Sequence, residues 1–522
     1  MILGDPEAAQ AKPTPGSRVT IDDVFGRVAR RRPDALALID PPNREAFTDG
    51  APRRLTYAEA DRVVAAIAAR LRHMGLPTDA VIGIQLPNIV ENVLTLLGVM
   101  RAGMIAAPLP LLWRRADTIA ALARIGGKAL ITCGRVGSFQ HGQFALRVAG
   151  DVFSIRYLCG FGAKLPDGIV PFDDLFSEAM PAPLPPLDRD RLSNPAAHVA
   201  AVTFDIHEDG IAAVARNHLE LLSGGLGVLL EARLTQDAAI LSTFAPSSFA
   251  GIALTLLPWL ISGGTLSLHH PFDPAVLVRH WRDERCGTLI VPGPVAFRLA
   301  ETGVLARAAL NCIVAPWRAP ERLAASPLWR EKDIAMVDVS VFGETGFVAA
   351  RRTASGRPGG LTLGPVVAPR GSADAVVVAE LVQSDAGTVA LRGAMVPHHA
   401  FPPGVERTAQ PHLKIGRGGL VDTGQTCRFD PVANALVVTG PPVGIVSIGG
   451  YRFALQDLQD VVGRIDAGAM LAVLPDPVVG QRLIGTATDR DTVRAALTAV
   501  GLNPLVVAAF EGRAEPGTPV AA

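Results

Sequence analysis

The N-terminal part of the chain alternates between two spacings of apolar side chains. Apolar residues in segment 60–75 recur at the spacing of an amphipathic helix that ends at Gly75. Segment 80–87 is a continuous apolar run, which is typical of a buried strand. The same two patterns then return as a helix over 91–103 and a strand over 105–110. This alternation predicts βαβ units around a mainly parallel sheet.

A proline-rich segment interrupts the alternation, which then resumes. Residues 180–195 are rich in proline and charge, so we expect a connection on the surface. Beyond it the pattern predicts a strand over 197–204 and a helix over 218–232. Short apolar runs predict further strands at 288–292 and 376–381.

A cluster of glycine and proline at 439–444 predicts a hinge. A chain of 522 residues is too long for one compact core, and a small pattern of mixed helices and strands follows the hinge. We therefore predict an α/β protein with a large domain over 18–440, a small α+β domain over 441–513, and tails over 1–17 and 514–522.

Composition excludes several classes of partner. Lys and Arg together number 49, as do Asp and Glu, so bulk charge attracts neither nucleic acid nor an anionic membrane. Five dispersed cysteines without a C-x-x-C pair predict a reducing compartment and no structural zinc. The most apolar stretch, 251–268, is broken by Pro258 and a glycine pair, so we expect no transmembrane segment and a cytoplasmic location.

A series of motifs runs in a characteristic order along the chain. Those motifs are LTYAEADRVVAAIAARLRHMGLPTDAVIGIQLPN, LLGVMRAGMIAAPLP, LPWLISGGTLSLHHPFDPAVL, VFGETG, VDTGQ, SIGGYRF and LPDPVVGQRL. In this order they resemble the adenylate-forming superfamily, which includes acyl-CoA synthetases, aryl acid ligases, luciferases and peptide-synthetase adenylation domains. The resemblance implies a large N-terminal domain of several subdomains and a small C-terminal domain, here truncated, that rotates between two half-reactions.

The resemblance also implies a chemistry. Family members join a carboxylate to ATP, with Mg²⁺, to give an acyl-adenylate and pyrophosphate. A thiol, usually coenzyme A or a carrier phosphopantetheine, then takes the acyl group. The expected cofactors are therefore ATP with Mg²⁺ and coenzyme A, and the expected partner is a small carboxylate or an acyl thioester. The oligomeric state stays open.

The segment that matches the family's phosphate loop lacks the residues that hold phosphate. The family places a loop of the form T-S-G-T-T-G-x-P-K before a helix with a Ser-His pair, and His218 marks that helix here. Counting back from His218 puts Ala212 at the lysine position, and a shift of register recovers no lysine. The degenerate loop then contains Asp205, His207, Glu208, Asp209 and Gly210.

Three of those side chains are carboxylates in a place where phosphates would lie. Two like charges about 5 Å apart repel by roughly 3 kcal/mol at an effective dielectric near 20. The acidic group therefore opposes nucleotide binding. Two interpretations of it stay open: a solvated acidic turn, or a cation site made by Asp205, His207, Glu208 and Asp209.

The other nucleotide motifs are partly retained. Phe342, Gly343 and Thr345 match the family's Y-G-x-T-E, which implies that Phe342 stacks on adenine and Thr345 reaches the α-phosphate. Gly346 replaces the glutamate that holds Mg²⁺ in relatives. Thr423 and Gly424 match T-G-D, with Gln425 in place of the aspartate that binds ribose.

Of the C-terminal motifs, one is retained and one is missing. Gly449 and Gly450 match the turn that lines the thiol tunnel in relatives, although an ordinary tight turn has the same pattern. The catalytic lysine that relatives carry near the C-terminus has no counterpart, because the last lysine of this chain is Lys414. Removing one preorganised electrostatic donor typically lowers a rate by about 10²–10³.

Two functions follow as hypotheses. In the first, the protein is an acyl-activating ligase whose ATP half-reaction is impaired or lost. In the second, it is a non-catalytic scaffold that binds an acyl group, an acyl-CoA or another protein. We assign no catalytic residue and no metal site from the sequence.

Overall fold

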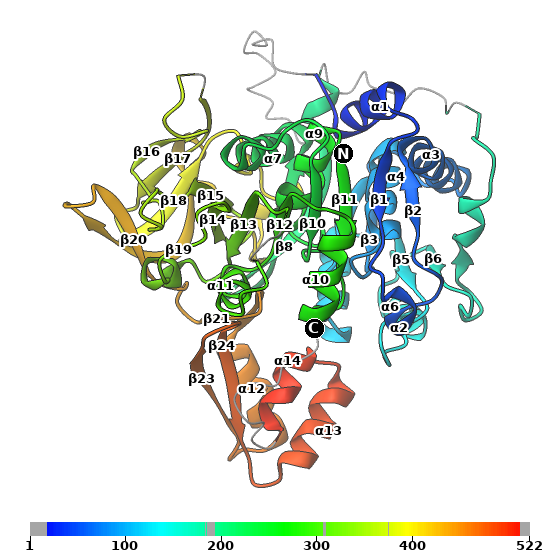
Figure 1. Cartoon of the computed structure of the whole chain (residues 1–522). Helices are drawn as coiled ribbons and strands as arrows, with labels where there is room; N and C mark the ends of the chain where they lie inside the picture. Colours follow the sequence, from blue (N-terminus) through cyan, green and yellow to red (C-terminus); the bar gives the residue numbers. More distant parts are fainter. Residues whose placement is uncertain (1–17, 183, 185–193, 306–308, 374, 512–522) are drawn as a thin grey trace.

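A computed structural model describes residues 18–511, except 183, 185–193, 306–308 and 374 (Figure 1). The predicted tails, 1–17 and 514–522, lie outside the described residues, as does most of the predicted connection at 180–195. Within the described part of the chain, none of the helices combines the length and the apolar character that a bilayer span needs.

The first large sheet has seven strands, in the order β7-β6-β5-β3-β4-β8-β9. Its neighbouring strands pair in parallel, except that β9 runs antiparallel to β8 at one edge. The strands are β3 (Val81–Ile84), β4 (Ile105–Pro108), β5 (Ala129–Cys133), β6 (Tyr157–Phe161), β7 (Val170–Pro171), β8 (Val199–His207) and β9 (Gly210–Asn217).

The second large sheet has eight strands, in the order β15-β14-β13-β12-β10-β11-β1-β2. Its inner pairs are parallel and its two outer pairs are antiparallel. The strands are β1 (Leu36–Ile39), β2 (Arg54–Thr56), β10 (Ala239–Ser242), β11 (Thr265–Leu268), β12 (Thr288–Ile290), β13 (Cys312–Trp317), β14 (Ala335–Phe342) and β15 (Gly346–Arg351).

Two smaller sheets are wholly antiparallel. The five-stranded sheet contains β16 (Gly364–Ala368), β17 (Val376–Gln383), β18 (Thr388–Arg392), β19 (Val421–Asp430) and β20 (Ala435–Gly440) in chain order. The last sheet has the order β22-β21-β24-β23 and is made of β21 (Ile445–Ile448), β22 (Tyr451–Ala454), β23 (Met470–Asp476) and β24 (Gly480–Thr486). It forms the smaller C-terminal domain, drawn in orange and red in Figure 1.

Helices cover the two large sheets and one side of the C-terminal sheet (Figure 1). The two longest begin with side-chain caps: Thr56 and Glu59 form a capping box on α3, and Asn217 and Glu220 form one on α7. Helices of four or more residues are α1 (Ile21–Arg31), α2 (Arg44–Phe47), α3 (Tyr57–His73), α4 (Val90–Arg101), α5 (Arg115–Ile125), α6 (His141–Asp151), α7 (His218–Ala232), α9 (Leu257–Ser262), α10 (Pro274–Asp283), α11 (Gly293–Glu301), α12 (Leu455–Ile465), α13 (Arg490–Val500) and α14 (Pro504–Val507).

This arrangement confirms the predicted fold class. The periodicity predicted two kinds of element in alternation, and both large sheets are mainly parallel with crossover helices. The strand predicted over 197–204 overlaps β8, which begins two residues later and runs on to His207, and the helix predicted over 218–232 is α7. A large N-terminal domain with several subdomains is followed by a small domain built on an antiparallel sheet.

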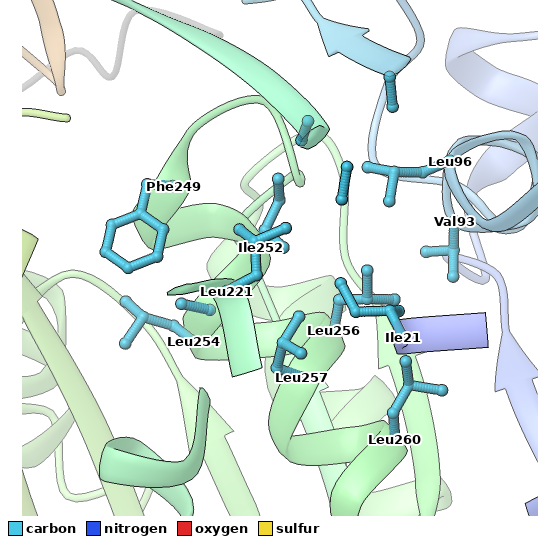
Figure 2. Packing of buried hydrophobic residues seen from close by; sticks show 14 of the residues in the cluster. Ile21, Val93, Leu96, Leu221, Phe249, Ile252, Leu254, Leu256, Leu257 and Leu260 are labelled. Atoms are coloured by element: carbon cyan, nitrogen blue, oxygen red, sulfur yellow. The ribbon is translucent and has the colours of Figure 1, made fainter. Parts of the chain in front are cut away.

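The core between the two large sheets is closely packed around α7 and the segment that ends in α9. Figure 2 shows Leu221 of α7 beside Ile252, Leu256 and Leu257, and each of these side chains is at most 1% exposed. Gly225 lets α7 come this close, because a Cβ atom there would overlap the side chain of Leu257. Interiors are packed near crystal density, so an added methyl group has nowhere to go.

We expect Gly225→Ala to destabilise the protein by about 1–3 kcal/mol through overpacking, although alanine is the better helix former. The measurement is the midpoint of urea unfolding. Gly150→Ala in α6 is the matched control, because open space surrounds its Cβ position, and it should be neutral or stabilise by up to about 1 kcal/mol. Equal midpoints for the two variants would contradict the close approach of α7.

Several histidines are buried in the neutral form. Burial lowers the pKa of His141 and of His269 to about 3, and that of His270 and His280 to about 4, with neighbouring charges adding smaller effects. An unfolded histidine has a pKa of about 6.5. Below that pH the unfolded chain therefore binds more protons than the folded protein.

Stability should consequently be full above about pH 6.5 and should fall as the pH is lowered, by up to about 1.4 kcal/mol per pH unit for each such histidine. The thermal midpoint measured from pH 7.5 down to pH 5 checks this, and His280→Gln should flatten the slope. His73→Gln, an exposed position at the end of α3, should leave the slope unchanged. An equally steep decline in the His280 variant would contradict the assignment.

Candidate functional site

The segment aligned with the phosphate loop is a β-hairpin. Strands β8 and β9 pair in register as far as His207 and Gly210, so only Glu208 and Asp209 form the turn, and both are exposed. This corrects the interpretation of residues 205–210 as a loop. Backbone N–H groups of a ladder point at the partner strand, whereas a phosphate cradle needs several that converge on one anion.

Asp205 is the buried acidic residue of the hairpin. Its side chain is 5% exposed and lies 2.9 and 3.1 Å from Nη1 of Arg452, which comes from β22 of the C-terminal domain. Its Oδ2 also accepts a hydrogen bond of 2.8 Å from the backbone N–H of Glu344. Burial alone would raise the pKa of Asp205, but the charge of Arg452, helped by His207 and by backbone N–H groups, holds it below its usual value.

The charge of Asp205 is therefore compensated, which the sequence argument did not foresee. That argument counted three uncompensated carboxylates in one cluster. Glu208 and Asp209 instead lie at the exposed tip of the hairpin, and the side chain of Glu208 packs against Gly444 in the connection to the C-terminal domain. Ala212, at the family's lysine position, is fully buried opposite Asp205.

Two glycines make room for the charged groups. Gly343 has φ +56°, and a Cβ atom there would overlap both the carboxylate of Asp205 and the guanidinium of Arg452. Gly450 has φ +93°, and a Cβ atom there would overlap the side chain of Arg318. Both positions need glycine for two reasons, the backbone conformation and the space.

A cavity of about 100 Å³ lies between the two domains at this point. Its charged lining comes from Asp205, Arg318, Glu344 and Arg452. The remaining wall includes hydroxyl groups and apolar side chains, among them Ser247, Ser248, Tyr451, Trp113, Phe204 and Val341.

A second buried arginine, Arg216, lies behind this wall. Arg216 in β9 is 1% exposed, donates through Nη2 to the carbonyl oxygens of Glu344 and Thr345, and places its guanidinium 3.7 Å from the ring centre of Phe249. Oε2 of Glu344 accepts a 2.7 Å hydrogen bond from the backbone N–H of Phe249. Burial lowers the pKa of Arg216 to about 10 and raises that of Glu344, which the charge of Arg216 opposes.

The C-terminal domain closes the cavity through several further contacts. The hydroxyl oxygen of Tyr451 accepts a 3.3 Å hydrogen bond from the backbone N–H of Leu112. Arg318 donates to the carbonyl oxygen of Gly450 at 3.4 Å, and Arg322 donates to that of Pro477 at 3.1 Å. The small domain is thus held against the large one on both sides of the cavity.

The structure brings together some of the sequence-predicted residues and separates others. Asp205, Gly343 and Gly450 line the cavity. Glu344, between two of the matched motif positions, lines it as well. The residues that lie elsewhere are His207, Glu208, Asp209, Gly210, Phe342, Thr345, Thr423, Gly424 and Gly449.

Phe342 and Thr345 are committed to other contacts. Phe342 is 1% exposed and packs in the main core, so its ring faces no open surface on which a base could stack. Thr345 is 3% exposed, and its backbone N–H donates a hydrogen bond to the carbonyl oxygen of Phe342.

The remaining predicted residues make contacts within turns and within the antiparallel sheets. The hydroxyl of Thr423 donates to the carbonyl of Val389 at 2.7 Å, and Gly424 lies against Pro442. The N–H of Gly449 donates to the carbonyl of Val479 at 2.9 Å.

Sequence reasoning missed the two arginines of the cavity. Arg452 lies two residues after the recognised turn at Gly449 and Gly450, and that position was the one available signal for it. Arg318 lies at the end of β13 in a segment without a recognised motif.

Solved structures with the same arrangement of elements decide the fold. The amide bond synthetase McbA from Marinactinospora thermotolerans matches with a TM-score of 0.71 over 94% of both chains, at 18% identity. The fold is that of the adenylate-forming enzymes. MbtA from Mycobacterium smegmatis has a TM-score of 0.62 and 18% identity, over 92% of this chain and 89% of that one. The predicted resemblance to the adenylate-forming superfamily is confirmed.

Sequence matches to known proteins cover only part of the chain. Residues 25–157 match the family model of the AMP-binding enzymes. Long-chain fatty acid transport protein 1 from Homo sapiens is 33% identical over 170 residues, which are 32% of this chain and 24% of that protein. The bassianolide nonribosomal cyclodepsipeptide synthetase from Beauveria bassiana is 33% identical over 90 residues, 17% of this chain and 2% of that protein. The chain thus spans a quarter or less of these relatives.

The ion pair between the domains generates a prediction. Asp205→Asn should destabilise the protein by about 3–5 kcal/mol because it leaves the buried charge of Arg452 unpaired. The double variant Asp205→Asn with Arg452→Gln should lose less than the sum of the single changes, by about 0.5–3 kcal/mol. Urea unfolding midpoints for the four proteins complete the cycle.

Glu301→Gln is the control, because the Arg298–Glu301 pair is exposed and such pairs contribute about 0–1 kcal/mol. Strictly additive effects of the two changes at Asp205 and Arg452 would contradict a direct pair.

Proposed function

We propose that this protein keeps the adenylate-forming fold but has lost the ATP half-reaction, and that it acts as a scaffold that binds an acid or acyl ligand. The observation that carries this proposal is the hairpin at β8 and β9, which sets the paired carboxylate of Asp205 beside Gly343 where relatives hold phosphate. The backbone N–H groups that β8 and β9 exchange in their ladder are not available to hold a phosphate.

The residues present do not fit ATP with Mg²⁺. Ligand pockets generally enclose about 300–1,000 Å³, whereas this cavity encloses about 100 Å³. Gly346 supplies no carboxylate for the metal ion. Among the described residues, no group of three or more His, Cys, Asp and Glu side chains could hold a metal ion. We therefore derive no catalytic step through either group.

The acid or acyl ligand is supported by the family and by the relatives. The family's reaction begins with a small carboxylate, and one relative is named for long-chain fatty acid transport. The site that supports such a ligand here is the cavity beside Gly343 and Gly450.

A second candidate function is adenylation in another domain arrangement. Rotation of the C-terminal domain would break the pair between Asp205 and Arg452 and would open the cavity. Such an opening leaves Asp205 uncompensated in front of the phosphates, so the physical argument still favours the first proposal.

The two functions differ in one assay. We expect no ATP–pyrophosphate exchange above background with short, medium or long carboxylic acids, because ATP lacks a cradle. A known adenylate-forming ligase, treated in parallel, supplies the positive control. Titration of ATP with Mg²⁺ by calorimetry should also show no saturable heat. Exchange that depends on both a carboxylic acid and the protein would overturn the proposal.

A further inference from the structure

Strand β23 forms the outer edge of the C-terminal sheet (Figure 1). It pairs with β24 along one side in continuous register, from Met470 opposite Thr486 to Asp476 opposite Gly480. Its face away from the helices is apolar, with Met470 65% exposed and Leu474 38% exposed. The strand contains no lysine or arginine. An apolar edge strand without basic residues is a template on which a strand of another chain can pair.

Two hydrogen bonds show which main-chain groups of β23 face the open edge. The N–H of Leu471 donates to Oε1 of Gln459 in α12 at 2.9 Å, and Nε2 of Gln459 donates to the carbonyl oxygen of Ala469 at 2.9 Å. In an antiparallel ladder, successive residues direct their main-chain groups alternately to the two sides of the strand. Val473 and Pro475 therefore face the open edge together with Leu471.

The side-chain amide of Gln459 occupies the place of a neighbouring strand at the beginning of this edge. A primary amide offers one carbonyl and one NH₂ group, and here they bind the N–H and C=O groups that a paired strand would bind. At the other end, Pro475 has no N–H to donate. Within β23, which the structure describes completely, Val473 is then the one residue that directs an unbound N–H outward.

From these contacts we propose that Gln459 and Pro475 close the outer edge of the C-terminal sheet against pairing with a second copy of this chain. This inference is independent of the function proposed for the cavity, because the described residues that line the cavity come from other elements. The closed edge lets the apolar face of β23 remain exposed to solvent without edge-to-edge association.

A second copy is the partner that an open edge would select, because β23 is complementary to itself. Antiparallel pairing about a two-fold axis at Val473 would set Ala472 of one copy opposite Leu474 of the other. It would also set Leu471 opposite Pro475 and would bring no like charges face to face. With Gln459 in place, Leu471 has no free N–H for this pairing, so only the two Val473 residues could exchange hydrogen bonds.

Sedimentation velocity of the full chain over a range of concentrations tests the closure. We expect the double variant Gln459→Leu with Pro475→Val to form a dimer of twice the unmodified mass, because both positions regain an N–H that can donate across the edge. Gln459→Glu should keep the unmodified mass, since its carboxylate still accepts from Leu471. The matched control is Gln456→Leu, because Gln456 is exposed on the same helix and bonds to Asp460.

A third substitution locates the contact in the dimer. Leu474→Lys added to the double variant should restore the unmodified mass, because it places like charges on neighbouring positions of the two paired strands. A dimer that persists in this triple variant would lie on another surface and would overturn the proposal. An unmodified mass of the double variant at every concentration, with a cooperative urea transition that shows it to be folded, would overturn it as well.

Amide hydrogen exchange in the unmodified protein is a test that needs no variant to fold. The amide of Leu471 should exchange roughly tenfold or more slowly than that of Val473, because Leu471 is hydrogen-bonded to Gln459 and Val473 meets solvent. In the double variant, the amide of Val473 should become protected at concentrations where the dimer forms. Equal exchange at the two amides of the unmodified protein would contradict the closure by Gln459.

Discussion

A buried ion pair between Asp205 and Arg452 joins the C-terminal domain to the large domain. The carboxylate of Asp205 is 95% buried by its surroundings, and an isolated charge there would be strongly unfavourable. The pair is tolerated because a backbone N–H group also binds the carboxylate and because glycines on both sides leave room for the guanidinium groups. Loss of either partner would leave the other buried without compensation.

The hairpin explains how the protein can keep the fold of the adenylate-forming enzymes without their phosphate-binding motif. A backbone N–H group donates once, either to a neighbouring strand or to an anion. In this protein β8 and β9 pair up to a two-residue turn, so the groups that would form a phosphate cradle belong to a ladder. The sheet keeps its shape, which explains the match to adenylate-forming enzymes over 94% of the chain despite 18% identity. Fold and site chemistry are therefore independent here.

The cavity is a property of the docked domains and of neither alone. Arg318 reaches it from the large domain, and Arg452 and Tyr451 reach it from the small one. Contacts of Tyr451 with Leu112 and of Arg322 with Pro477 hold that arrangement.

Local pattern alone identified the elements, because the spacing of apolar residues reflects which face of each helix or strand is buried. It predicted α3, α4, β8 and α7 and the order of motifs that marks the superfamily. It could not predict that Asp205 meets Arg452, since 247 residues separate them and each lies in an ordinary local sequence. Nor could it place Phe342, because an aromatic side chain at that position could either stack on a ligand or fill the core. The packing of β14 puts Phe342 in the core. The tertiary structure decided both, because charge compensation and burial depend on neighbours in space and not in sequence.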